Sequence, residues 1–407
     1  MHIVCSKCQH EVPFGTLGRC PICGGILRPE YPEEAIRQLR WIEPGRGIDR
    51  YRELLPVTSP IPYLGEGDTP LIPSKRIGAS LDLKHLYFKN EGLNPSGAFK
   101  DRAGALVAAL AVDAGANGIL SASSGNASSA IAAYCAAAGL KCVILMEPGN
   151  PPAKLRQTLA TGAQVVLVEG VFANGPEALA DFLSAAAAQA NFYLGFVWAP
   201  VNPYILEGIK TIAYEVAARL PGAPDVVITP VGGGDMFAAQ WRGYQELLKA
   251  EVTEHLPRMI GVQSENAPPL IEAVRTNAQT VATLPYARSK ISGINVPFTG
   301  DHALAAVQES GGTAVGVTDE SVWAMQRRLA LEEGIWVEPA GAAPVAALQT
   351  LIELGAIHSD ERIVCIMSGA GFKDATLAAE SADRIGQQAT TPFDVGAVVA
   401  QIAADGK

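Results

Sequence analysis

The sequence predicts an α/β protein with two doubly wound parallel sheets, preceded by a small cysteine-rich segment. Two observations predict the sheets: short, continuously apolar runs, typical of parallel strands buried on both faces, and Ala-rich helical stretches that alternate with them. The third observation is a pair of Cys-x-x-Cys units near the N-terminus. With 407 residues, the chain has room for two or three domains and a large core.

Seven apolar runs are the expected strands: Leu86–Lys89, Gly118–Ala122, Cys142–Met146, Val165–Val168, Val226–Thr229, Met259–Val262 and Ile363–Met367. Helices are expected between them, for example over Ala98–Asp113, Ala127–Ala138, Pro152–Thr161 and Glu320–Glu333. Residues 31–80 are rich in proline and glycine, which favours extended chain. In the tail, Val395–Ala404 is a weak amphipathic segment.

Charge and hydropathy argue against several classes of function. Thirty-one Lys and Arg against 41 Asp and Glu give a net charge of −10, which repels the phosphates of nucleic acids. No apolar run approaches the roughly 18 residues that a membrane-spanning helix needs. No basic segment followed by an apolar one marks a signal peptide. We therefore expect a soluble, cytoplasmic protein that binds neither nucleic acid nor a membrane.

Four of the seven cysteines form two pairs, Cys5-x-x-Cys8 and Cys20-x-x-Cys23. Each pair supplies two thiolates from one tight turn, and together they give the four sulfur ligands that structural zinc favours. In a reducing compartment such pairs indicate metal ligands rather than disulfides. The alternatives are a segment that has lost its metal, a redox-active dithiol, and a site in which His2 or His10 serves as a ligand.

Four strand-to-helix junctions are polar or glycine-rich, and sites are expected at the carboxyl ends of parallel strands. The first, residues 94–102, reads NPSGAFKDR and places Lys100 in the first turn of an apolar helix. The helix dipole disfavours a cation there, which pushes the amine toward the neutral, nucleophilic form that Schiff-base chemistry requires. The alternative is a surface lysine that begins a helix.

The other three junctions suit anions or a polar ring. Residues 123–126 read SSGN and open an Ala-rich helix, where free amides and hydroxyls bind a carboxylate or phosphate, or simply cap the helix. Residues 230–235 read PVGGGD, and three consecutive glycines let the backbone approach a phosphate. Ser368 follows the last strong strand and can hold a neutral ring nitrogen by one hydrogen bond, unless it is an ordinary turn serine.

Together these segments resemble the pyridoxal-phosphate enzymes of the tryptophan-synthase-like fold, fold type II, and within them the threonine synthase family. The resemblance spans residues 1–375 and includes two further motifs, LGEGDTPL at 64–71 and EGIKT at 207–211. The lysine motif and the SSGN loop are specific for the superfamily. The cysteine segment and LGEGDTPL narrow the resemblance toward threonine synthase.

The resemblance implies how pyridoxal 5'-phosphate would be bound. Lys100 would form the internal aldimine and shuttle protons. Asn126 would bind the cofactor's 3-oxygen, and Ser368 would contact its pyridine nitrogen. The cofactor phosphate would be cradled by Gly232, Gly233 and Gly234. A hydroxyl partner leaves the pyridine nitrogen largely unprotonated, which favours elimination and replacement over transamination.

The implied reaction converts O-phosphohomoserine and water to threonine and phosphate, by γ-elimination and hydration at Cβ. The substrate α-carboxylate would be bound by Ser123, Ser124 and Gly125. In the family an arginine that suits phosphate commonly follows the SSGN helix, but Ala137 stands at that position, and Lys154 is a candidate to supply the missing charge. The EGIKT motif also has Ile209 where the family has glutamine.

Other functions remain open at this stage. They are an ammonia-lyase acting on serine, threonine or diaminopropionate, a β-replacement enzyme using phosphoserine, and a catalytically silent protein whose zinc-ribbon-like segment binds a partner. The resemblance implies a homodimer. It also implies a larger cofactor-binding α/β domain (31–120 and 196–385), a smaller mobile α/β domain (121–195), the zinc-ribbon-like segment (1–30) and a C-terminal tail (386–407).

Overall fold

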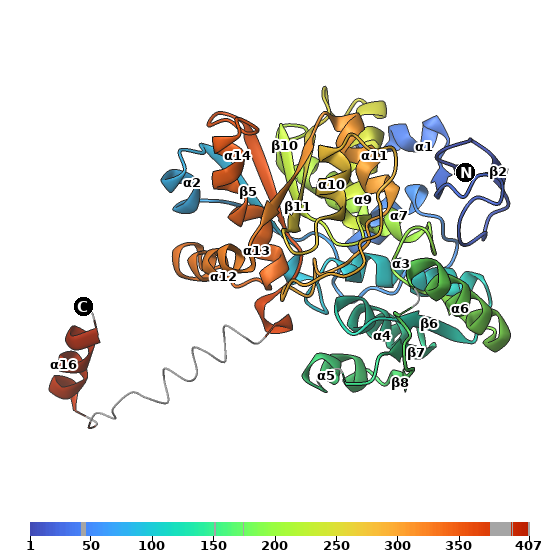
Figure 1. The fold of residues 1–407 in the computed structure, drawn as a ribbon, viewed down its shortest axis with the longest axis horizontal. Helices are drawn as coiled ribbons and strands as arrows, with labels where there is room; N and C mark the ends of the chain where they lie inside the picture. Colours follow the sequence, from blue (N-terminus) through green and yellow to red (C-terminus); the bar gives the residue numbers. More distant parts are fainter. Residues whose placement is uncertain (42–45, 150–151, 174, 375–391, 393, 406–407) are drawn as a thin grey trace. The chain divides into compact units, whose positions relative to one another are not determined.

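The structure is a computed structural model that describes residues 1–41, 46–149, 152–173, 175–374, 392 and 394–405 (Figure 1). The chain divides into two compact units, Met1–Lys373 and Asp374–Lys407. In the second unit, helix α16 spans Val395–Asp405, over the amphipathic segment expected in the tail. The other helices and the strands of the described residues belong to the first unit.

The larger sheet has the strand order β12-β11-β10-β13-β5-β4. Its strands are β4 (Leu71–Pro73), β5 (His85–Asn90), β10 (Val226–Pro230), β11 (Arg258–Ser264), β12 (Thr313–Val317) and β13 (Arg362–Met367). All neighbouring strands are parallel except β4, which pairs antiparallel with β5 at the edge. The central strands β10 and β13 are buried and apolar, as expected of a sheet covered on both faces.

The smaller sheet has the order β8-β7-β6-β9, and all its neighbouring strands are parallel. Its strands are β6 (Gly118–Ala122), β7 (Lys141–Met146), β8 (Gln164–Leu167) and β9 (Tyr193–Leu194). The connecting helices α4 (Asn126–Ala138), α5 (Pro152–Ala160) and α6 (Gly175–Ala190) surround it in Figure 1. Two parallel α/β sheets therefore confirm the fold class predicted from the sequence.

The remaining helices connect the strands of the larger sheet or precede it. They are α1 (Glu33–Arg37), η1 (Gln38–Trp41), η2 (Gly47–Leu54), α2 (Ile77–Ser80), η3 (Glu91–Leu93), α3 (Lys100–Asp113), α7 (Ile205–Ile209), α8 (Thr211–Arg219), α9 (Asp235–Lys249), α10 (Pro269–Arg275), α11 (Asp301–Ser310), α12 (Asp319–Arg328), η4 (Leu329–Glu333), α13 (Pro339–Ala346), α14 (Leu348–Glu353) and η5 (Gly371–Lys373). Among them, α3 packs against both α4 and α7, so it links the helices around the two sheets.

The N-terminus forms a separate antiparallel sheet in the order β2-β1-β3. Its strands are β1 (His2–Cys5), β2 (Glu11–Val12) and β3 (Leu27–Glu30). The expectation of extended chain over residues 31–80 is wrong in part, because this stretch contains α1, α2 and the 3₁₀ segments η1 and η2. In η2, Ile48, Tyr51 and Leu54 are buried at helical spacing, and this burial outweighs the nearby prolines and glycines.

All seven strands expected from the sequence are present, each within a residue or two of its predicted bounds. Six other strands were not predicted: β1, β2, β3, β4, β9 and β12. Most are short or at a sheet edge, where the apolar signal is weak. The predicted helix at Ala98 begins at Lys100 instead, because Ala98 forms a β-bridge with Gly369. Among the described residues, no helix combines the length and apolarity needed to span a membrane.

A buried ion network lies beneath the start of α3. The Arg102 guanidinium donates to Glu91, with Nε to Oε2 at 2.8 Å, and to Glu215, with Nη1 to Oε1 at 2.6 Å. Lys89 on β5 donates to the Glu215 carboxylate and to the Thr69 carbonyl at 2.7 Å. All four charged side chains are essentially inaccessible to solvent, and two cations balance two anions.

Charge balance predicts the effect of breaking this network. Arg102→Met should leave two carboxylates facing one ammonium in the core and cost about 3–5 kcal/mol of unfolding free energy. Urea denaturation followed by circular dichroism measures the loss. Arg102→Met/Glu215→Gln restores neutrality and should recover part of it. Arg37→Ala, which removes an exposed ion pair with Glu33, is the control and should leave the midpoint unchanged. Equal midpoints for Arg102→Met and the control would contradict the prediction.

Candidate active site

The lysine loop and the serine loop are joined by backbone hydrogen bonds. The Phe99 amide donates to the Ser368 carbonyl at 3.0 Å, and the Ala370 amide donates to the Gly97 carbonyl at 2.8 Å. Two junctions that lie about 270 positions apart in the sequence, at Lys100 and Ser368, are therefore brought together where β13 ends and α3 begins.

Lys100 is a partly buried amine on the first turn of α3. Its Nζ lies 4.7 Å from the centroid of the Phe99 ring, and no described residue forms a hydrogen bond with it. Burial lowers the pKa of Lys100, while the negative charges of Asp235 and Glu338 act in the opposite direction. The effect of burial is the larger, so the neutral and nucleophilic form of the amine is favoured. The sequence analysis predicted the same direction, but from the helix dipole.

The glycine loop presents free amides at the N-terminus of α9. The Gly232 carbonyl accepts from Thr299 Oγ1 at 2.7 Å, and the Gly233 carbonyl accepts from the Gly300 amide at 3.0 Å. Within the described residues, the amides of Gly232, Gly233 and Gly234 have no acceptor. A Cβ on Gly234, whose φ is 96°, would lie 2.7 Å from the Ala303 side chain. This loop therefore suits an anion.

Asp235 follows the glycine loop and would oppose an anion there if its carboxylate were free. That carboxylate accepts a hydrogen bond from the Ala199 amide at 2.8 Å and lies 3.1 Å from His302 Nε2. Asp235 is therefore engaged by its own neighbours. The three loop amides, which have no acceptor within the described residues, therefore remain available to an anion.

The SSGN loop opens α4, as predicted. Ser123 and Ser124 are half-buried, and Gly125 is exposed immediately before the helix. Ser123 Oγ accepts from the Gly125 amide at 3.2 Å, while Asn126 is the first helical residue. Asn126 Nδ2 donates to Glu338 Oε2 at 2.9 Å.

Glu338 is a functional candidate that the sequence analysis missed. It directly precedes α13 and lies within reach of two predicted cofactor contacts, because its Oε1 accepts from Ser368 Oγ at 2.8 Å and from Asn126 Nδ2 at 3.2 Å. A Cβ on Gly369 would come within 2.6 Å of the same carboxylate. Its signal in the sequence was slight: an acidic residue directly before Pro339 at the start of a helix.

Lys373 is a second candidate that was missed. Its Nζ donates to the Ser96 carbonyl at 3.0 Å, to Ser129 Oγ at 2.7 Å and to Gln157 Oε1 at 2.6 Å. All three acceptors are neutral, and no carboxylate of the described residues forms a salt bridge with this ammonium. Burial lowers the pKa of Lys373, against the opposing charges of Glu338 and Asp101.

The structure changes how two departures from the family pattern are interpreted. Ala137 is exposed in the last turn of α4, 11 positions after Asn126, or about 16 Å along the helix at its usual rise. An arginine there would stand at the opposite end of the helix from the SSGN loop. Ile209 is fully buried in the core. For Lys154, the backbone lies in α5, but its side chain is outside the described part of the structure.

The two remaining motifs support the ion network. Thr69, from LGEGDTPL, donates its hydroxyl to Glu91, and Thr211, from EGIKT, accepts from Arg102 Nη1 at 2.9 Å. Glu66 is buried and accepts from the hydroxyl of Tyr134 on α4 at 2.9 Å. These motif residues therefore hold α3, α4 and α8 in place around the lysine loop.

Comparison with known proteins decides the family. A family model described as "Pyridoxal-phosphate dependent enzyme" matches residues 63–369. Threonine synthase from Methanocaldococcus jannaschii is 38% identical over 389 residues, covering 93% of this chain and 94% of its own. The chain belongs to the threonine synthase family of pyridoxal-phosphate-dependent enzymes. Threonine synthase from Methanosarcina acetivorans is 36% identical over 382 residues, which cover 92% of this chain and 92% of its own.

Solved structures confirm fold type II. Maize serine racemase superposes with a TM-score of 0.68 at 19% identity, covering 88% of this chain and 98% of its own. The processed form of threonine deaminase isoform 2 from Solanum lycopersicum gives a TM-score of 0.66 at 21% identity, covering 91% and 93%. At these identities the likeness shows the fold alone.

The residues of this threonine synthase family member fit its cofactor, pyridoxal phosphate. The glycine loop offers three amides at a helix N-terminus that find no acceptor in the described part of the chain, which suits the phosphate. Lys100 offers an amine that forms no hydrogen bond with any described residue. Asn126 and Ser368 both direct donors to the Glu338 carboxylate, so these two polar groups face the same small region.

Glu338→Gln should shift the pH at which the cofactor attaches. Only a neutral amine attacks an aldehyde, and the Glu338 charge opposes the lowering of the Lys100 pKa. Removing that charge should lower this pKa further, so the midpoint of the attachment rate against pH should move to lower pH. Stopped-flow absorbance on apoprotein mixed with pyridoxal phosphate measures it. Glu353→Gln, at the exposed end of α14, is the control. An unchanged midpoint would refute the coupling.

Proposed function

We propose that this protein makes threonine from O-phosphohomoserine and water, releasing phosphate by γ-elimination followed by hydration at Cβ. The observation that carries the proposal is the amine of Lys100, which is partly buried, lies at the meeting point of the lysine and serine loops, and forms no hydrogen bond with the residues that the structure describes. Relatives similar over nearly the whole chain are threonine synthases. Together these support a lyase rather than a silent scaffold.

Pyridoxal phosphate, when bound, supplies an electron sink for charge that develops on the substrate. Lys100 would hold its aldehyde and then, once displaced by the substrate amine, remove the Cα proton as a general base. A lowered pKa prepares Lys100 for both tasks. The cofactor phosphate would be bound by Gly232, Gly233 and Gly234. Asn126 would hold the 3-oxygen and Ser368 would contact the ring nitrogen.

The substrate would be oriented by the SSGN loop. Its α-carboxylate would lie against Ser123, Ser124 and Gly125, where the first amides of α4 and two hydroxyls offer donors. Its phosphate needs a cation, and Lys373 is suited to that role because, among the described residues, its ammonium is hydrogen-bonded to neutral acceptors. Lys154 stays the alternative cation on α5.

Three further features belong to this proposal. Residues 121–195, around the smaller sheet, would be the mobile domain, and residues 31–120 and 196–385 the cofactor-binding one. The family likeness supports a homodimer, which light scattering of the purified protein would test. A biosynthetic role and unpaired cysteines support a cytoplasmic location.

A substrate panel tests the reaction directly. Purified protein given O-phosphohomoserine should release threonine and phosphate in equal amounts, and Lys100→Ala should lower the rate by about 10²-fold or more. Borohydride reduction and peptide mapping should find a pyridoxyl group on Lys100. Ammonia and a 2-oxo acid from serine or threonine, without phosphate release from O-phosphohomoserine, would instead identify an ammonia-lyase. A colourless protein that takes up no cofactor would identify a scaffold.

Paired variants distinguish the two candidate cations. If Lys373 binds the substrate phosphate, Lys373→Met should raise the KM for O-phosphohomoserine about tenfold or more, since charge-assisted hydrogen bonds are worth about 1.5–3 kcal/mol. Lys154→Met should then leave KM unchanged. Steady-state phosphate release measures both, and the dissociation constant of the cofactor shows whether either variant disturbs the cofactor site. The opposite pattern would assign the role to Lys154, and two unchanged KM values would exclude both lysines.

A further inference from the structure

We infer that Cys5, Cys8, Cys20 and Cys23 bind one structural Zn²⁺, and that this ion fixes the segment Trp198–Tyr204 against the glycine loop. Metal and cofactor would therefore stabilise one another. The metal site follows from the cysteine geometry alone. The coupling to the cofactor rests in addition on the proposed role of the glycine loop.

The two cysteine pairs lie in two copies of the same turn. In the first, the Cys5 amide donates to the His10 carbonyl at 2.9 Å and the Gln9 amide donates to the Cys5 carbonyl at 3.0 Å. In the second, the Cys20 amide donates to the Gly25 carbonyl at 2.8 Å and the Gly24 amide donates to the Cys20 carbonyl at 2.9 Å. Gln9 and Gly24, at matching positions, both have positive φ.

The sulfur atoms of these turns lie where one tetrahedral ion needs them. All four Sγ atoms are within 4.8 Å of one another, with Cys5 and Cys23 at 3.4 Å and Cys8 and Cys20 at 3.7 Å. A zinc ion with bonds of about 2.3 Å places its sulfurs about 3.8 Å apart, whereas a disulfide needs about 2.05 Å. Binding would deprotonate the thiols and release their protons to solvent.

The residues around the four cysteines favour a site with four sulfur ligands. A Cβ on Gly25 would lie 2.7 Å from Cys5 Sγ and 3.3 Å from Cys23 Sγ, so only glycine leaves room for the sulfurs to converge. His2 Nδ1 is paired with Glu11 at 2.6 Å, and neither His2 nor His10 belongs to the cluster found among the described residues. The histidine alternative raised by the sequence therefore finds no support in the geometry.

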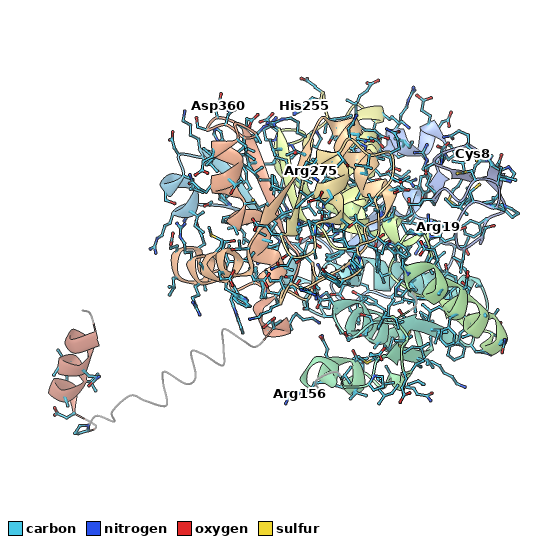
Figure 2. The ribbon with its side chains drawn as sticks, viewed as in Figure 1. Cys8, Arg19, Arg156, His255, Arg275 and Asp360 are labelled. Carbon is cyan, nitrogen blue, oxygen red and sulfur yellow. The ribbon has the colours of Figure 1, made fainter. Side chains whose placement is uncertain are left out.

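The segment between the cysteine pairs docks on Trp198–Tyr204. The Gly18 amide donates to the Val201 carbonyl at 2.9 Å, and the Gly15 amide donates to the Tyr204 hydroxyl at 2.8 Å. Phe14 meets the Tyr204 ring edge-on at 5.6 Å. The Arg19 guanidinium, one residue before Cys20, lies 5.9 Å from the Trp198 ring centroid. Arg19 and Cys8 are both labelled in the N-terminal part of the molecule in Figure 2.

The same segment contacts the glycine loop from its other side. Trp198 is 5% exposed, and a Cβ on Gly233 would lie 3.2 Å from its Cδ1 atom. The Ala199 amide donates to Asp235, the residue that follows the loop. Trp198 Nε1 is buried and has no acceptor among the described residues. One short stretch of backbone thus connects the segment between the cysteine pairs to the glycine loop.

Metal analysis of the full-length holoprotein tests the site. Plasma mass spectrometry should find one zinc per chain in the wild type and none in Cys5→Ser/Cys20→Ser, while the matched control His10→Ala should keep its zinc. A wild type that lacks zinc, and takes none up when reduced protein is given ZnCl₂, would overturn the proposal, as would a double cysteine variant that keeps the metal.

Cofactor titration tests the coupling without any substrate. Zinc withdrawn from folded protein by a chelator should raise the dissociation constant of pyridoxal phosphate about fivefold or more, and ZnCl₂ should restore it. Because the coupling is reciprocal, pyridoxal phosphate should increase the zinc affinity, measured by competition with the same chelator, by the same factor. Tyr204→Phe, which removes only the acceptor of the Gly15 amide, should keep the zinc and weaken both effects.

The outcomes separate this inference from the proposed function. Unchanged cofactor affinity after zinc withdrawal would refute the coupling, even in an enzyme that makes threonine. Conversely, a zinc-loaded protein that binds pyridoxal phosphate but releases no phosphate from O-phosphohomoserine would refute the reaction and leave the metal site intact. A protein that binds zinc but no pyridoxal phosphate would refute both the coupling and the proposed cofactor site.

Discussion

The candidate active site depends on one buried guanidinium. Arg102 lies two residues after Lys100, so the contacts that hold Arg102 also hold the backbone that carries the Lys100 amine. Glu91, which follows β5, and Glu215 on α8 hold it from two sides. Such a network contributes little to stability compared with an apolar core of equal volume, yet it is costly to break. The network instead fixes the position of the start of α3 relative to both β5 and α8.

Around Lys100, burial and charge act in opposite directions. Burial alone lowers its pKa, and the carboxylates of Asp235 and Glu338 limit the shift. Glu338 also accepts a hydrogen bond from the Ser368 hydroxyl, and a hydroxyl can donate only one hydrogen bond. On the proposed cofactor placement, a ring nitrogen beside Ser368 would compete with Glu338 for that hydrogen bond. The electron sink would then depend on Glu338 as well as on Ser368.

The sequence predicted the features that depend on local residue patterns, and it missed the site residues that are defined by tertiary contacts. Continuous apolar strands and the glycine loop were visible, because burial on two faces and close approach to an anion each require particular residue types. Glu338 and Lys373 were not, since an acidic residue before a proline and a lysine in a turn occur in many surfaces. The serine loop is brought beside Lys100 by tertiary backbone contacts, Phe99 with Ser368 and Gly97 with Ala370. The significance of Ala137 could not be judged from the sequence either, because a motif position does not show where on a helix the residue lies relative to the site.

The position of Lys373 suggests how substrate binding would be linked to the geometry of the proposed site. Lys373 joins the lysine loop at Ser96 to Ser129 on α4 and Gln157 on α5, so its ammonium bridges the parts of the chain that surround the two sheets. An ammonium with only neutral partners gains most from an anion brought to it. A substrate phosphate bound there would pull α4 toward the lysine loop and exclude water from Lys100. Phosphate recognition and protection of the reacting amine would then be two consequences of one contact.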